Sequence, residues 1–234
     1  MIPNRPPVLA HERFVADREN YAGLDLAARF ERTNLWGAAT SVSGLGSEDP
    51  ATAAIREALP ALLQRLGARS LLDAPCGDAG WIGRMKLDVD YIGIDIVPSL
   101  IEANNQRVAR GELTGRFRVA DITRDALPPV DVVLCRDCLV HLSFQNIARA
   151  IARFRDSGAR FLLVTTFSEW DGNRDCEDGD WRALNIEKAP FNWPAPRVVI
   201  NERCDEGGGG WRDKSLGLWR LDELPHIARI ATDM

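Results

Sequence analysis

The stretch Leu71-Leu72-Asp73-Ala74-Pro75-Cys76-Gly77-Asp78-Ala79-Gly80-Trp81 organises this chain of 234 residues. Two leucines lead into Asp73, and a turn of small residues then opens a short helix. The pattern predicts a strand, a tight loop and a helix N-terminus, where backbone N–H groups are available and glycine lets a ligand approach closely. A second apolar run, Tyr91-Ile92-Gly93-Ile94-Asp95, also ends on a carboxylate. An acid about 20 residues after a glycine-bearing first turn is where a Rossmann-type sheet binds a ribose.

The same alternation of strand and helix continues along the chain. Near-continuous apolar strands separated by helices indicate a parallel sheet that is covered on both faces. The expected strands lie at 69–74, 90–95, 116–120, 130–135 and 160–166, and the expected helices lie near 79–85, 98–111 and 143–155.

Two later runs predict a hairpin. Residues 197–202 and 215–220 are strand-like, and the glycine run 207–210 between them suits a flexible turn. Five parallel strands followed by an antiparallel hairpin differ from the double βαβαβ unit of a dehydrogenase. The sequence therefore predicts an α/β fold with a Rossmann-like sheet of seven strands and helices on both faces.

The segment before the sheet is expected to be helical. His11–Arg32 has an interrupted apolar face with helical spacing. A further helix is expected to begin with Asp49 as its N-cap, to run to about Leu66 and to be capped by Gly67. Pro60 is expected to kink or interrupt that helix.

Residues 34–47 are rich in glycine and serine and predict a loop. A solvated linker is the plainer alternative, but Trp36 favours a loop that closes over a ligand. We therefore expect 1–47 to form an N-terminal helix and a lid loop, and 48–234 to form the main domain. Within that domain, 168–196 has no clear period and is expected to lie over the carboxyl edge of the sheet.

Composition narrows the classes of function. The chain is 45% hydrophobic and 27% charged, and its net charge of −5 comes from interspersed acids and bases. Without a basic stripe, nucleic acid is disfavoured as a substrate. We find no signal peptide and no run long enough to span a membrane, so no membrane partner is expected. Five cysteines without a secretory context suggest reduced thiols in a cytoplasm.

Over about residues 45–222 the chain resembles the class I S-adenosylmethionine-dependent methyltransferases. Its loop Asp73-Ala74-Pro75-Cys76-Gly77-Asp78 is similar to that of a bacterial branch of this family. The common family loop reads Asp-x-Gly-x-Gly-x-Gly, whereas here Pro75 replaces the first glycine and Ala79 the third. The resemblance also rests on Asp95, Asp121 and the run Leu134-Cys135-Arg136-Asp137-Cys138-Leu139-Val140-His141-Leu142.

This resemblance implies a site for S-adenosyl-L-methionine at the strand ends. Asp73 would orient the loop or meet the cofactor's ammonium group through water, and Asp95 would accept hydrogen bonds from both ribose hydroxyls. The other implied contacts are the backbone of Ala74, Pro75, Cys76 and Gly77 along the methionine portion, Ile96 on an adenine face, Asp121 and Ile122 at the adenine edge, and Cys135 and Arg136 beside the sulfonium.

Plainer roles exist for several of these residues. Asp73 and Asp95 could be ordinary helix caps, Asp121 could be a turn residue, and Trp81 is better explained as packing beneath the loop. A redox pair or half a zinc site could use the Cys-x-x-Cys that begins at Cys135, but no second pair has ligand spacing. We expect thiols that line a buried pocket, and no required metal.

Methyl transfer from a sulfonium is an in-line displacement, so the protein must orient the acceptor and exclude water. A hydroxyl acceptor also needs a base, and His141 is the candidate because a histidine pKa is ordinarily near neutrality. Asp137, four residues earlier, could orient the imidazole or approach the substrate. With His141 as the base, kcat is expected to rise through an apparent pKa of about 6–7. The alternative is that His141 packs under the loop.

The acceptor pocket is expected to come from the N-terminal loop and from 168–196. Aromatic side chains there could stack on a sugar or an aromatic ring, and basic side chains could bind an anion. The candidates are Trp36, Ser43, Trp170, Trp181, Trp193, Arg182 and Lys214.

The resulting hypothesis is a cytoplasmic monomer or homodimer that methylates a small molecule or glycan on oxygen. N-methylation of a small amine or peptide is the alternative activity. A cofactor-binding regulatory protein without catalysis is the alternative from another class. A base at the rim of the sheet disfavours that last reading, because a non-catalytic protein needs none.

Overall fold

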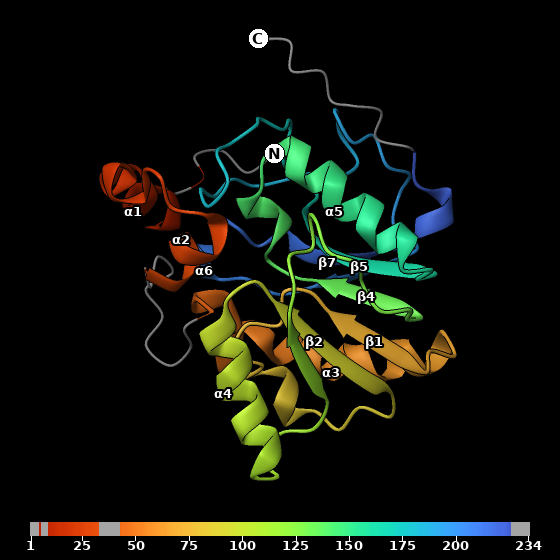
Figure 1. Ribbon diagram of the computed structural model, residues 1–234. Coiled ribbons are helices and arrows are strands. Elements are labelled where there is room, and N and C mark those ends of the chain that lie inside the picture. Colours follow the sequence, from red (N-terminus) through yellow and green to blue (C-terminus); the bar gives the residue numbers. More distant parts are fainter. Residues whose placement is uncertain (1–4, 6–8, 33–42, 226–234) are drawn as a thin grey trace.

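The computed structural model describes Arg5 and residues 9–32 and 43–225 (Figure 1). Its strands are β1 (Ser70–Asp73), β2 (Asp90–Asp95), β3 (Arg116–Val119), β4 (Val132–Cys135), β5 (Phe161–Phe167), β6 (Val198–Asn201) and β7 (Lys214–Arg220). Its helices are α1 (Leu9–Ala16), α2 (Leu26–Arg32), α3 (Asp49–Arg65), α4 (Pro98–Ala109), α5 (Phe144–Asp156) and the short α6 (Glu206–Gly209).

The strands form one seven-stranded sheet in the order β3-β2-β1-β4-β5-β7-β6. Strands β1 to β5 pair in parallel, and β7 runs antiparallel to both β5 and β6. The predicted parallel sheet with a C-terminal antiparallel pair is confirmed. The order reverses between β1 and β4, and in open α/β sheets a ligand binds at the carboxyl ends of the strands beside such a switch point.

Alternate residues of each central strand enter two separate cores, as the pleat requires. Leu72, Val133 and Leu162 face the core that contains α5, whereas Leu71 and Val132 face the core that contains α3. The sheet is thus buried on both faces, and its strands read as apolar throughout. Figure 1 shows α5 on one side of the sheet and α3 and α4 on the other.

The N-terminal helix prediction is wrong in its continuity. The expected helix over His11–Arg32 is divided into α1, a 3-10 turn (Arg18–Tyr21) and α2. Gly23 has a φ of +77°, which ends the first segment, and the Asp25 carboxylate then accepts the N–H of Ala28 at 2.8 Å at the start of α2.

Helix α3 corrects two further expectations. Its N-cap is Glu48 rather than Asp49, and the helix continues through Pro60 without interruption. The buried apolar face of α3 offsets the hydrogen bond that proline cannot make. Gly67 follows the helix with a φ of +60° and donates to the carbonyl of Gln64 at 3.0 Å, so the predicted glycine cap is confirmed.

No helix in the described part of the chain is long and apolar enough to cross a membrane.

Candidate functional site

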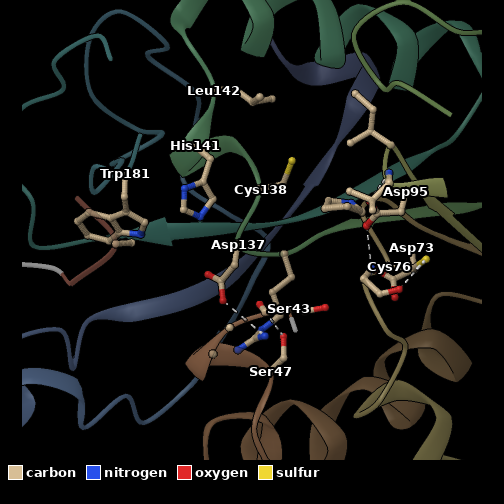
Figure 2. Close-up of a pocket in the computed structure, with 18 of the residues that line it drawn as sticks. Ser43, Ser47, Asp73, Cys76, Asp95, Asp137, Cys138, His141, Leu142 and Trp181 are labelled. Atoms are coloured by element: carbon tan, nitrogen blue, oxygen red, sulfur yellow. Dashed lines mark hydrogen bonds and ion pairs between the residues drawn. The ribbon is translucent and has the colours of Figure 1, made fainter. Parts of the chain in front are cut away.

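A cavity of about 480 Å³ opens at the carboxyl ends of β1, β2 and β4. Figure 2 shows Asp73, Cys76 and Asp95 on one side of it and Asp137, His141 and Trp181 on the other. We call the first side the strand-end half, which also includes Pro75, Gly77, Trp81, Ile96, Asp121 and Ile122. We call the second side the aromatic half, which also includes Leu26, Cys138, Leu142, Phe167, Glu206, Trp211 and Lys214.

The loop after β1 is held by hydrogen bonds to its backbone groups. Cys76 N–H donates to the carbonyl of Ile94 at 2.8 Å, which ties the loop to β2. From α4, the Asn104 amide donates to the carbonyl of Gly77 at 2.8 Å, and Arg107 donates to the carbonyl of Asp78 at 2.6 Å. These three contacts hold the loop against β2 and α4, and Pro75, Cys76 and Gly77 of the loop line the cavity.

Asp95 lies at the end of β2 with both carboxylate oxygens engaged. One oxygen accepts the N–H of Gly77 at 3.0 Å, and the other accepts the N–H of Val97 at 3.0 Å. Burial raises the pKa of Asp95, although these backbone donors and that of Ile96 oppose the shift. Because each carboxylate oxygen carries two lone pairs, Asp95 can still accept hydroxyl groups from the cavity.

Asp121 serves as a turn residue and also lines the cavity. Its Oδ1 accepts both the N–H and the hydroxyl of Thr123 at 2.7 Å. Asp121 therefore has the role of a turn residue, and it also belongs to the strand-end half of the cavity.

Asp73 is a buried acid beneath the loop. It accepts the Tyr91 hydroxyl at 2.8 Å, and burial raises its pKa from 3.8 to about 7. The nearby Arg136 guanidinium opposes this shift, and Asp95 adds to it. A group whose pKa is higher in the folded state stabilises the fold at low pH, and this contribution is lost as the pH rises through the folded value.

We expect the urea midpoint of the wild-type protein to fall between about pH 4 and about pH 7 relative to that of Asp73→Asn. The asparagine still accepts the Tyr91 hydroxyl but has no proton to lose in this window. Parallel stability curves for the two proteins across that window would contradict the raised pKa.

Four charged side chains form a cluster between the two halves, in which three are buried and Asp137 is 28% exposed. The Arg136 guanidinium donates to Glu202 at 2.6 Å, and Lys214 donates to Asp137 at 2.7 Å. Lys214 also lies 3.3 Å from Glu202, and Arg136 lies 3.5 Å from Asp137. The two cations lower the pKa of Asp137 to about 2 against the effect of burial. The cluster is thus electrically balanced and brings together the ends of β4, β6 and β7.

His141 follows β4 in a short 3-10 turn (Leu139–His141) and is buried. Its Nδ1 lies 2.8 Å from the carbonyl oxygen of Asp180. A carbonyl only accepts, so Nδ1 carries the proton and Nε2 is the ring nitrogen that can accept one. Figure 2 shows the ring between Trp181 and Cys138.

Two expectations about His141 are wrong. Burial lowers its pKa to about 4, rather than leaving it near neutrality. Its imidazole is oriented by a backbone carbonyl, whereas the Asp137 carboxylate accepts from Lys214 at 2.7 Å and from the Thr165 hydroxyl at 3.4 Å. Asp137 instead lines the cavity directly.

Three aromatic rings build one wall of the aromatic half. Trp181 and Trp211 meet edge to face with their centroids 5.0 Å apart, and Phe167 contacts both rings in the same manner. Trp181 was predicted, but Phe167 and Trp211 were missed as lining residues. The position of Phe167 at the end of β5 could have indicated it.

Several predicted acceptor residues lie elsewhere. Arg182 is buried and donates to the carbonyls of Leu139 and Leu142, so its guanidinium is not available to an anion. Trp170 packs on Trp211 behind the wall, and Trp193 packs on Trp219 in the core. None of these three residues lines the cavity, and Trp36 lies outside the described residues.

Two predicted cofactor residues are also set back from the cavity. Ala74 and Cys135 are fully buried behind its lining. The remaining predicted residues of the strand-end half do line it, as does Arg136. Trp81 lies beneath the Arg136 guanidinium, 5.5 Å from ring centroid to Cζ, and both packs and lines the cavity.

The end of the N-terminal loop lies directly on the site. The Ser43 hydroxyl accepts the N–H of Asp78 at 3.0 Å, and a Cβ on Gly77 would meet that hydroxyl at 2.1 Å. A Cβ on Gly46 would meet the Asp137 carboxylate at 2.7 Å. Glycine at 77 and 46 therefore allows residues 43–47 to cover the cavity closely.

All five cysteines are free. Within the described residues, no group of three or more His, Cys, Asp or Glu side chains could hold a metal ion.

Residues 71–157 match a family described as a methyltransferase domain. A comparison with curated protein sequences found no match. Among solved structures, the bacterial CtHen1-CN methyltransferase domain is similar with a TM-score of 0.53 and 14% identity, over 73% of this chain and 99% of that one. A Burkholderia thailandensis 1,6-didemethyltoxoflavin-N1-methyltransferase, crystallised with 1,6-didemethyltoxoflavin and S-adenosylhomocysteine, is similar with a TM-score of 0.51 and 17% identity, over 93% of this chain and 92% of that one.

The PH0226 protein of Pyrococcus horikoshii is less similar, with a TM-score of 0.39 and 18% identity. The likeness covers 51% of this chain and 61% of that one. The sheet order and the better of these likenesses place the chain in the Rossmann-like fold of the class I methyltransferases. The matching domain supports the family resemblance seen in the sequence. The assignment to a branch with the Asp-Ala-Pro-Cys-Gly-Asp loop stays a prediction.

Proposed function

We propose that the protein is an S-adenosyl-L-methionine-dependent methyltransferase that transfers a methyl group to a hydroxyl of a small molecule or glycan. One observation carries the proposal: a single cavity joins the acids at the ends of β2 and β3 to a histidine whose Nδ1 lies on the Asp180 carbonyl. The match to a methyltransferase domain over 71–157 supports the same activity.

The residues of the strand-end half fit this cofactor. Asp95 retains lone pairs for two ribose hydroxyls, and Asp121 with Ile122, which also line the cavity, would contact the adenine edge. The absence of a side chain at Gly77 lets Ser43 close on the loop, which its three anchoring contacts hold in place. Asp73, a buried acid that lines the cavity, would orient the loop or meet the cofactor's ammonium group through water. When bound, S-adenosyl-L-methionine supplies an electrophilic methyl group.

The aromatic half would orient the acceptor. Phe167, Trp181 and Trp211 offer ring faces and edges to a sugar or an aromatic ring. His141 Nε2 would accept the hydroxyl proton, while the Asp180 carbonyl holds the opposite ring nitrogen. The balanced charge cluster would keep Asp137 ionised beside the acceptor.

Residues 43–47 would act as the last part of a lid that excludes water. The hydrogen bond from Asp78 to Ser43 and the lack of room for any Cβ on Gly46 beside Asp137 support this role. We therefore divide the chain into a covering segment, 1–47, and a catalytic domain, 48–234. Within that domain, 168–196 contributes Trp181 to the cavity and would be an acceptor-site insertion. The five free cysteines support a reducing compartment such as the cytoplasm.

Asp95→Ala is expected to weaken S-adenosyl-L-methionine binding by about 1.5–3 kcal/mol, the range for lost hydrogen bonds to a charged group. Asp90→Ala is the matched control, because Asp90 lies exposed at the other end of β2 and pairs with Arg116. Calorimetry on both folded variants measures the difference. Equal affinities in the two variants would remove Asp95 from the cofactor site.

One observation favours N-methylation as a second candidate. A histidine with a pKa of about 4 is a weak base, and an amine acceptor already carries its lone pair. The structurally similar Burkholderia enzyme is named as an N1-methyltransferase. Identification of the methylated atom in the product distinguishes the two activities.

A further inference from the structure

We propose that His11 is a positioning residue for His141, acting through Asp180. The inference rests on the proposed function insofar as His141 is the base. The link itself concerns the tautomer and orientation of one imidazole, which can be measured without turnover.

Asp180 contacts both histidines with different groups. His11 Nδ1 lies 2.6 Å from the Asp180 carboxylate, to which it donates, and His141 Nδ1 lies 2.8 Å from the Asp180 carbonyl oxygen. The His11 side chain is 39% exposed and that of Asp180 is 15% exposed. His11, on α1, thus holds the side chain of Asp180, and the backbone carbonyl of Asp180 holds His141.

The same carboxylate oxygen also binds the aromatic half. Asp180 Oδ1 accepts the N–H of Trp181 at 2.6 Å, and Trp181 lines the cavity beside His141. The neighbouring backbone is paired to the His141 turn, since Gly179 N–H donates to the His141 carbonyl at 2.8 Å. A shift of Asp180 would therefore move the base and the aromatic wall together.

The N-terminal helices dock on this segment at further points. Arg18 and Arg29 both pair with Glu177, at 2.9 Å and 3.0 Å, and Ala10 and Leu26 line the cavity. His11 differs from the two arginines because its partner is the residue that touches the imidazole of His141. His11 is therefore expected to affect the orientation of His141 in addition to docking the N-terminal helices on this segment.

His11→Ala, His11→Asn and Arg18→Ala test the link. An asparagine amide can replace Nδ1 as the donor to Asp180, whereas alanine cannot. Arg18→Ala removes an exposed ion pair of the same docking surface without touching Asp180. The chain has three histidines, so nitrogen-15 spectra of the imidazoles resolve the His141 tautomer directly.

We expect wild type, His11→Asn and Arg18→Ala to show His141 protonated on Nδ1. His11→Ala should show a second tautomer and a kcat about 3- to 10-fold lower, the range for the net contribution of one ordinary hydrogen bond, with an unchanged KM for the cofactor. An unaltered His141 spectrum in His11→Ala, or equal losses in His11→Ala and His11→Asn, would overturn the link. A changed spectrum in a protein that methylates nothing would uphold the link and refute the proposed function.

Discussion

His141→Ala is expected to lower kcat by about 10²–10⁴-fold while leaving the affinity for S-adenosyl-L-methionine nearly unchanged. A hydroxyl is almost wholly protonated at neutral pH, so a positioned base contributes most to such an acceptor. His141 lies in the aromatic half, away from Asp95 (Figure 2), and its loss should not disturb the proposed cofactor contacts.

His141→Asn is the matched variant for this test. Its amide can donate to the Asp180 carbonyl as Nδ1 does, but it has no basic nitrogen. A base therefore predicts equal losses in kcat for the alanine and asparagine variants. Recovery of activity in His141→Asn would show that the residue is structural.

The lowered pKa fixes the pH dependence of the wild type. Because His141 is neutral above about pH 4, its ability to accept a proton is retained from there upward and is lost as the pH falls through that value. We expect no inflection in kcat from histidine between about pH 6 and pH 7. Because the pKa of Asp73 also lies at about 7, the profile is measured in Asp73→Asn as well. A rise in kcat through that range that persists in Asp73→Asn would contradict the lowered pKa of His141.

Arg136→Met is expected to destabilise the fold by about 3–5 kcal/mol, because it removes one of the two cations of the cluster and leaves Glu202 and Asp137 to share Lys214 alone. The side chains of Arg136 and Glu202 are 4% and 2% exposed, so water cannot replace the lost partner. Urea denaturation of the variant and the wild type gives the difference in unfolding free energy.

Arg197→Met is the control for this stability measurement. Arg197 pairs with Glu223 on the surface, where both side chains are about half exposed. Such pairs contribute about 0–1 kcal/mol. A similarly small loss in Arg136→Met would show that the buried cluster adds little to stability.

The succession of strands along the chain and most of the strand-end half could be predicted from the sequence, because both depend on local patterns. The acids at 73, 95 and 121 each follow an apolar run, and parallel strands bring their carboxyl ends to one edge. The residues that we propose to bind the cofactor are therefore close in sequence to the elements that position them.

The aromatic half could not be predicted in the same way, because its contacts join distant segments. Lys214 reaches Asp137 across 77 positions, and Asp180 holds His141 from a segment without any period. Arg182 was misassigned because a cation in such a segment looks exposed in sequence, whereas backbone carbonyls surround it in the fold. The pKa of His141 likewise depends on burial, which a sequence motif does not report.

The central claim is tested most directly by incubating the protein with S-adenosyl-L-methionine that carries an isotope-labelled methyl group and with panels of hydroxyl-bearing aromatic, glycosidic and amine acceptors. Mass analysis of the products and of released S-adenosylhomocysteine locates the label. The account predicts labelled oxygen in a hydroxyl acceptor and its loss in His141→Asn. Label found only on nitrogen would contradict the O-methylation, and saturable cofactor binding without transfer to any acceptor would contradict the enzyme itself.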